Sequence, residues 1–109
     1  MLFREVRSGV EVSVLGPLRI TCDGEEVDPG PARQQAVLLS LLLRANTSVS
    51  AERILYEAWG PGKPSSGTRV VPTYIYRIRR LLSSMGRAEG AAQVTSGREG
   101  YTLVMSEHR

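Results

Sequence analysis

Arginine, tyrosine and threonine recur within one short stretch of this sequence, SSGTRVVPTYIYRIRRLL at residues 65–82. Arginine guanidinium groups bind phosphates and the acceptor edge of guanine, and threonine and tyrosine offer hydroxyl groups to the same surfaces. The chemistry available to this stretch is therefore recognition of double-stranded DNA. Its candidate binding residues are Arg69, Thr73, Tyr76, Arg77 and Arg80, with Arg79 beside them.

The apolar residues of the same stretch fall at helical spacing and predict one buried stripe, formed by Val71, Tyr74, Ile75, Ile78, Leu81 and Leu82. A helix would place most of the basic and hydroxyl residues on its outer side, where a major groove could receive them. A solvated surface helix explains this helix alone equally well. Pro72 is awkward inside a helix, so we expect a start near Thr68 with a local distortion, the other possibility being a start close to Pro72.

The charge of the chain is concentrated around this stretch. From Ala58 to Ala88 there are six basic residues and no acidic one, whereas residues 1–57 hold six basic and eight acidic residues. Such an asymmetry is typical of a local anion-binding surface, although a run of charge also occurs on solvated faces.

The remaining patterns predict one domain, residues 10–105, between a disordered N-terminus at 1–9 and a tail at 106–109. Alternating residues predict strands at 10–14 and 18–22, and Asp23-Gly24 predicts a hairpin turn into a short strand at 25–27.

Two helices and a closing hairpin complete this expected domain. Helices are predicted at 32–45, which is apolar on most of its circumference, and at 51–59 with Ser50 as its cap. Residues 83–90 read as a linker. Residues 92–95 and 101–105 alternate around a glycine-rich tip that carries Arg98. The predicted fold class is α+β, a winged helix-turn-helix with an N-terminal antiparallel sheet, three helices and a C-terminal β-hairpin wing.

An enzyme is poorly supported by these residues. The only histidine is His108 and the only cysteine is Cys22, which we expect to be a buried thiol in a strand. No pair of carboxylates lies in a pattern that suggests acid/base catalysis, and the sequence shows no metal-ligand or phosphate-loop spacing, so we expect no catalytic residue, cofactor or metal. The N-terminus lacks the apolar core of a secretory signal, so the expected location is cytoplasmic.

The order and spacing of five segments resemble a known family. The segments are VEVSVLGPLRI, PARQQAVLLSLLLRAN, ILYEAWG, VPTYIYRIRRLL and VTSGREGYTL. Together they are similar to the N-terminal domain of Streptomyces antibiotic regulatory proteins, an OmpR-like winged helix-turn-helix. The resemblance implies a transcriptional activator that binds direct repeats upstream of promoters in secondary-metabolite gene clusters. It also implies contact with RNA polymerase and its principal sigma factor, and a dimer on DNA is one arrangement compatible with it.

The resemblance also implies roles for individual residues. Arg77 would be the leading base-reading side chain with Thr73 beside it, and Arg98 would lie on the wing. Residues at positions that usually touch phosphates or sugars are Arg69, Tyr74, Tyr76 and Arg79. Trp59 matches a tryptophan that abuts the DNA backbone, and Tyr101 matches the wing tyrosine.

Some of these roles have a plainer alternative, and two positions depart from the family pattern. Trp59 is at least as well explained by core packing, and Tyr74 belongs by periodicity to the core, with only its hydroxyl free. Pro72 replaces a polar residue of the recognition helix. Gly97 stands where the family has a wing arginine, and Arg98 follows one position later. A winged helix used only to bind another protein remains the rival function.

Overall fold

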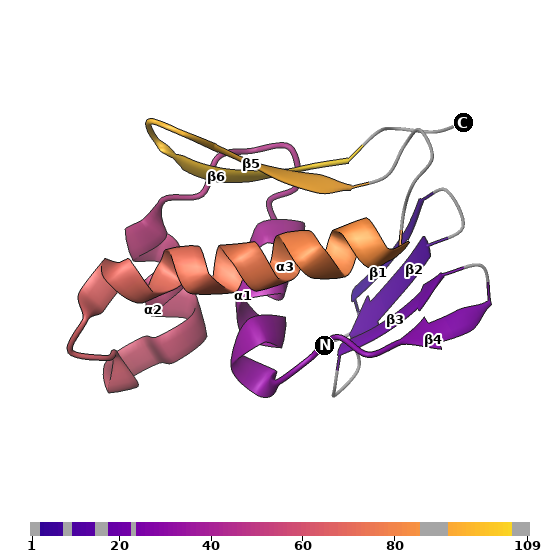
Figure 1. The fold of residues 1–109 in the computed structure, drawn as a ribbon, viewed down its shortest axis with the longest axis horizontal. Coiled ribbons are helices and arrows are strands. Elements are labelled where there is room, and N and C mark those ends of the chain that lie inside the picture. The colour runs from indigo at the N-terminus through magenta and orange to yellow at the C-terminus, as the bar shows by residue number, and fades with distance from the viewer. Residues whose placement is uncertain (1–2, 8–9, 15–17, 23, 86–91, 106–109) are drawn as a thin grey trace.

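The computed structural model describes residues 3–7, 10–14, 18–22, 24–85 and 92–105. Within these residues the chain forms a sheet, then helices, then a hairpin (Figure 1). In chain order the elements are β1 (Phe3–Arg7), β2 (Val10–Val14), β3 (Leu18–Cys22), β4 (Glu25–Val27), α1 (Ala32–Leu42), α2 (Ala51–Trp59), the 3₁₀ turns η1 (Gly60–Gly62) and η2 (Gly67–Val70), α3 (Val71–Met85), β5 (Gln93–Gly97) and β6 (Gly100–Val104).

The N-terminal sheet is an antiparallel meander in the order β1-β2-β3-β4. The turn between β3 and β4 contains Gly24, whose φ of 87° is a conformation that glycine adopts without strain. The expectation that residues 1–9 are disordered is wrong for Phe3–Arg7, because these residues pair with β2 from Phe3↔Val14 to Arg7↔Val10. The side chain of Cys22 and the tail at 106–109 lie outside the described residues.

Helices α1 and α2 confirm the sequence-based expectation, with α1 ending a turn earlier than expected. The α2 cap is Ser50, whose Oγ accepts a 3.0 Å hydrogen bond from the Arg53 N–H. After α1 the chain turns through Asn46, which has a φ of 67°. The core that these helices share with the sheet and hairpin is made by Leu18, Ile20, Val37, Leu38, Leu41, Leu42, Val49, Ile54, Leu55, Val71, Ile75, Ile78, Leu82, Val94, Leu103 and Met105.

Helix α3 begins at Val71, so the expected α-helical start near Thr68 is wrong and the start close to Pro72 is correct. A 3₁₀ turn, η2, occupies Gly67–Val70 in front of it. Pro72 therefore lies in the first turn of α3, where its missing N–H needs no partner within the α-helix. The helix also continues through Ser83 to Met85, where a linker was expected.

The wing is a hairpin with a shorter tip than the sequence indicated. Gly97 pairs with Gly100, so only Arg98 and Glu99 form the turn. A backbone bridge attaches β6 to the α1–α2 connection: Val49 N–H donates to Tyr101 O at 2.7 Å and Tyr101 N–H donates to Val49 O at 2.9 Å. The wing is thereby fixed to the loop that precedes α2.

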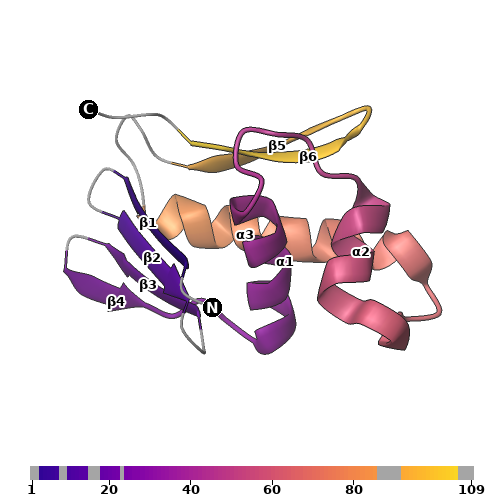
Figure 2. The same ribbon diagram turned by 180° about the vertical axis from the view of Figure 1, so that it is seen from behind.

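The elements form a winged helix-turn-helix, as expected. Helix α3 runs across the front of the molecule, with the wing along one side of it and the N-terminal sheet near its C-terminal end (Figure 1). The opposite view has α1 and α2 in front of α3 (Figure 2). The face of α3 opposite α1 and α2 is thus left uncovered by them.

Candidate nucleic-acid interface

The uncovered face of α3 carries polar and basic side chains. Thr73, Tyr76, Arg77 and Arg80 are all exposed, and Tyr76 retains 59% of its accessible surface. Helix α3 has three arginines and no acidic residue. The face therefore presents positive charge and hydroxyl groups together, as the sequence predicted.

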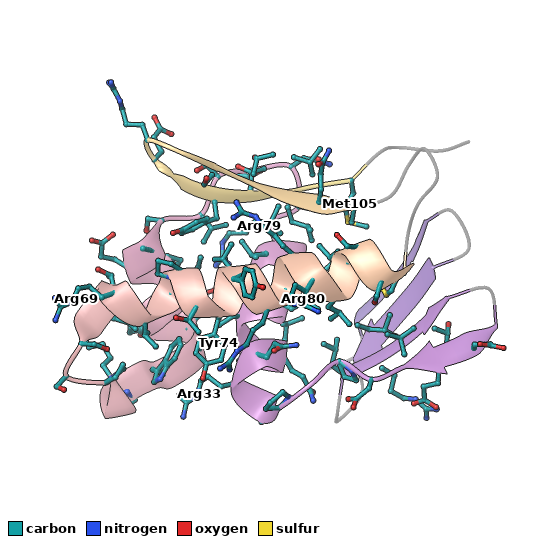
Figure 3. All side chains as sticks on the ribbon, in the orientation of Figure 1. Arg33, Arg69, Tyr74, Arg79, Arg80 and Met105 are labelled. Atoms are coloured by element: carbon teal, nitrogen blue, oxygen red, sulfur yellow. The ribbon has the colours of Figure 1, made fainter. Side chains whose placement is uncertain are left out.

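Arg69 precedes this face because it lies on η2 rather than within α3. Its side chain is exposed at the N-terminal end of α3 (Figure 3). Arg69 therefore lies at the edge of the exposed face of α3.

Aromatic rings support two arginines of the face. The Arg77 guanidinium carbon lies 5.1 Å from the Tyr74 ring centroid, and that of Arg80 lies 5.9 Å from the Tyr76 centroid. Arg80 also donates a 3.3 Å hydrogen bond to the Tyr76 hydroxyl. The ring contact restricts the Arg77 guanidinium without using its N–H donors, whereas Arg80 uses one donor on the Tyr76 hydroxyl and keeps the others for a ligand.

Tyr74 and Trp59 are half-buried and pack on the core, which agrees with the packing alternative for both residues. Their rings meet edge to face, with centroids 5.3 Å apart and planes at 80°. This contact joins the end of α2 to α3.

Arg33, in the first turn of α1, belongs to the same group and was not among the sequence-derived candidates. Its guanidinium carbon lies 4.9 Å from the Trp59 ring centroid, and its Nη1 donates a 3.0 Å hydrogen bond to the Ala58 carbonyl. Arg33, Trp59, Tyr74 and Arg77 thus form a row from α1 across α2 to α3. Arg33 joins this row through contacts over 25 or more residues, which local spacing does not reveal.

Arg79 is exposed but contacts the wing, and Tyr101 is part of the wing itself. Arg79 Nε donates a 3.0 Å hydrogen bond to the Val94 carbonyl of β5, which holds the wing against α3. In Figure 3, Arg79 lies between α3 and the wing. Tyr101 is half-buried against the core, and its backbone forms the bridge to Val49. Local spacing does not reveal the Arg79 contact, because Val94 lies 15 residues further along the chain.

Arg98 is exposed at the tip of the wing, in the two-residue turn with Glu99. It is separate from the row that Arg33, Trp59, Tyr74 and Arg77 make. The structure therefore brings most candidates together on or beside α3 and leaves Arg98 on the neighbouring wing.

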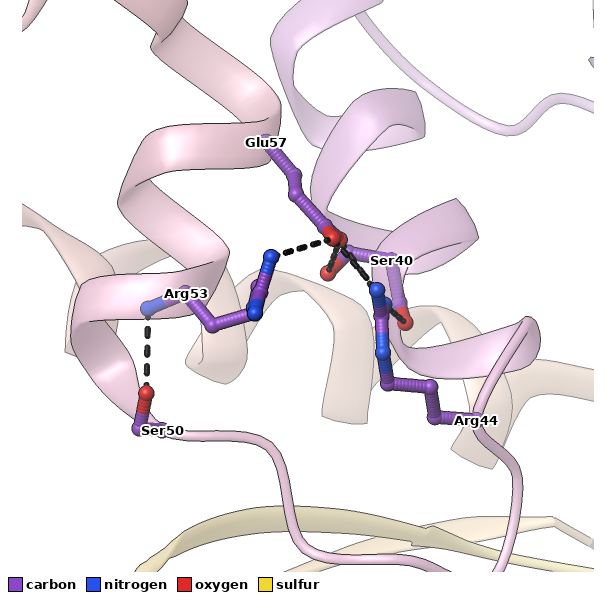
Figure 4. A network of polar contacts seen from close by, with 5 residues as sticks. All are labelled: Ser40, Arg44, Ser50, Arg53 and Glu57. Carbon is purple, nitrogen blue, oxygen red and sulfur yellow. Dashed lines mark hydrogen bonds and ion pairs between the residues drawn. The ribbon is translucent and has the colours of Figure 1, made fainter.

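A polar network fixes α2 against α1 behind this surface (Figure 4). The Glu57 carboxylate accepts hydrogen bonds from Ser40 Oγ at 2.7 Å and Arg44 Nη1 at 2.8 Å, and it forms an ion pair with Arg53. Partial burial raises the pKa of Glu57, but the hydrogen bonds from Arg44 and Ser40 and the nearby guanidinium charges outweigh burial. The pKa of Glu57 is consequently below its ordinary value.

The described part of the chain contains no group of three or more His, Cys, Asp and Glu side chains that could hold a metal ion. No helix within it is long and apolar enough to cross a membrane.

Comparison with known proteins places the chain among regulators. Residues 24–103 match the family model described as "Transcriptional regulatory protein, C terminal". The chain is 34% identical over 100 residues to the transcriptional regulatory protein MoaR1 of Mycobacterium tuberculosis, spanning 92% of this chain and 32% of that protein. It is 36% identical to the regulatory protein AfsR of Streptomyces coelicolor, spanning 72% of this chain and 8% of AfsR. It is 32% identical to the regulatory protein DnrI of Streptomyces peucetius, spanning 68% of this chain and 27% of DnrI. The chain thus spans a third or less of each of these relatives.

Solved structures have the same fold. Mycobacterium tuberculosis EmbR, in complex with a low-affinity phosphopeptide, superposes with a TM-score of 0.75 at 26% identity, over 93% of this chain and 26% of EmbR. The DNA-binding domain of CpxR from E. coli also gives a TM-score of 0.75, at 17% identity, over 96% of this chain and 99% of that domain.

Proposed function

The chain belongs to the family of transcriptional regulatory protein C-terminal domains, and from this premise we propose that it binds double-stranded DNA in a sequence-specific manner. The resemblance to an OmpR-like winged helix and to Streptomyces antibiotic regulatory proteins is confirmed, since AfsR and DnrI are relatives of the chain. The observation that carries the proposal is the uncovered face of α3, with exposed Thr73, Tyr76, Arg77 and Arg80 and no acidic residue on the helix.

In the proposed complex α3 lies in the major groove. Arg77 reads bases through its free N–H donors while the Tyr74 ring limits its motion, and Thr73 lies one helical turn before it. Arg69, Tyr76 and Arg80 contact phosphates, which position the helix without reading sequence. Trp59, Tyr74, Arg79 and Tyr101 have lesser roles, because their described contacts hold the surface in shape.

The wing contributes a second contact in this proposal. Arg98 projects from the two-residue turn and reaches the adjacent backbone or minor groove. Its position is set by the bridge from β6 to Val49 and by the hydrogen bond from Arg79 to β5.

We further propose that the chain positions a transcriptional activator of secondary-metabolite biosynthesis genes on direct repeats near a promoter. Contact with RNA polymerase and its principal sigma factor, and a cytoplasmic location, belong to the same proposal. Its support is the relationship to AfsR and DnrI, both of which are named regulatory proteins. These activities concern a whole regulator, of which this chain corresponds to one domain.

A fluorescence-anisotropy titration tests DNA binding by the wild-type chain. The labelled duplex carries a site that this protein selects from a random pool, with random duplex as competitor, at two salt concentrations. We expect tight, competitor-resistant binding that weakens steeply as salt rises, because phosphate contacts release counterions. Failure to select any site, together with binding that salt does not affect, would refute the proposal and favour a protein-binding module.

A further inference from the structure

We propose that Arg33 binds a DNA phosphate and that Trp59 and the end of α2 hold it in place for this purpose. The inference rests on the proposed function and extends it to α1, an element that no sequence motif assigned to DNA. Arg33 would form, with Trp59, a phosphate clamp on the side of α3 away from the wing.

The Arg33 side chain is exposed, yet two contacts fix its guanidinium. The ring of Trp59 lies under it at 4.9 Å, and the Ala58 carbonyl accepts one of its N–H groups at 3.0 Å. Ala58 belongs to the last turn of α2, where carbonyls lack partners within the helix and favour a cation. An arginine that is already ordered loses less entropy when it binds a ligand.

Most of the hydrogen-bonding capacity of Arg33 is unused. A guanidinium has five N–H donors, and the contact to Ala58 uses one of them. Within the described residues Arg33 forms no ion pair with a carboxylate. The remaining donors form a planar fork of the kind that binds phosphate oxygens.

The position of Arg33 in the fold favours a DNA phosphate over a free anion. Arg33 and Tyr74 lie on one side of α3, whereas Arg79 and the wing lie on the other (Figure 3). A helix in the major groove has a sugar-phosphate backbone along each side of it. The wing then faces one backbone and the clamp faces the other.

The row of rings and cations connects this clamp to the base-reading residue. Trp59 touches Tyr74, and Tyr74 supports Arg77. A phosphate bound at Arg33 would therefore fix the end of α2 and, through the two rings, the depth at which Arg77 enters the groove.

The test compares Arg33→Ala, Arg33→Lys and the wild type in anisotropy titrations on the selected duplex and on a random duplex, each across a salt series. Arg19→Ala is the matched control, because Arg19 is an exposed arginine on β3 whose partner is Glu26 in the sheet. Circular dichroism and thermal unfolding establish that each variant is folded. Trp59 is the only tryptophan of the chain, so its emission reports directly on the clamp.

We expect Arg33→Ala to weaken binding to both duplexes about tenfold, the loss of one charge-assisted hydrogen-bonded contact. The slope of log K against log salt should become shallower by about 0.9, the value for one phosphate. Arg33→Lys should restore the slope but not the full affinity, and Arg19→Ala should match the wild type. DNA binding should change the emission of Trp59 in the wild type.

Equal binding by Arg33→Ala and Arg19→Ala would overturn the inference while leaving the proposed function intact. So would a loss of affinity with an unchanged salt slope, because Arg33 would then only support Trp59. A wild-type chain without salt-dependent DNA binding would overturn both.

Discussion

Gly100 is the position at which one added methyl group should do the most damage to the wing. A Cβ there would lie 2.1 Å from the Val49 carbonyl oxygen, and the Gly100 φ of 144° is one that alanine rarely adopts. Strand β6 must then move away from the α1–α2 connection, which breaks the two backbone hydrogen bonds between Val49 and Tyr101. At about 1 kcal/mol for each bond and about 1–3 kcal/mol for backbone strain, Gly100→Ala should lower the free energy of unfolding by about 3–5 kcal/mol.

Gly97→Ala is the matched control for this prediction. Gly97 is the register partner of Gly100 in the same hairpin, but a Cβ on it meets nothing within 4 Å. Chemical denaturation should give Gly97→Ala a free energy of unfolding within about 0.5 kcal/mol of the wild type. The thermal midpoint of Gly100→Ala should fall by roughly 10–20 °C. Equal stability of the two variants would refute the close approach between β6 and the α1–α2 connection.

Two further changes probe the surface and its support. Arg69→Ala should weaken binding to selected and random duplexes alike, because Arg69 lies on η2 beside the α3 face; a change in base preference, measured by anisotropy, would contradict a phosphate role. Glu57→Gln should lower the free energy of unfolding at neutral pH by about 1–2 kcal/mol, since it removes the charge that Arg44 and Ser40 bind. The lowered pKa of Glu57 makes its contribution present above about pH 4.3 and lost as pH falls through the folded-state pKa, so the two proteins should converge in acid. Denaturation curves that stay equally far apart at low pH would contradict this.

The helices were predictable from the sequence because local signals specify them. Ser50 and the spacing of Ile54 and Leu55 place α2 correctly. The buried side of α3, including Val71, Ile75 and Ile78, follows its apolar spacing. The start expected near Thr68 is wrong because proline favours the first turn of a helix, which places the start at Val71.

The remaining features depend on strand pairing and side-chain packing that residue spacing alone does not show. Strand β1 forms because β2 offers it an edge, and FREVR alone has no signal strong enough to predict a strand. The hairpin tip is shortened by pairing that extends to Gly97 and Gly100. Arg33 joins the candidate interface only through Trp59 and the end of α2, so its type and position in the sequence did not distinguish it.

The most direct measurement of base reading by α3 is the affinity of Arg77→Ala relative to wild type, on the selected duplex and on random duplex in parallel. Arg77 is exposed, and Tyr74 supports its guanidinium. We expect the variant to lose about 1–3 kcal/mol on the selected site, to lose less on random DNA and to accept more bases at one position of the site. An equal loss on both duplexes would contradict base reading by Arg77.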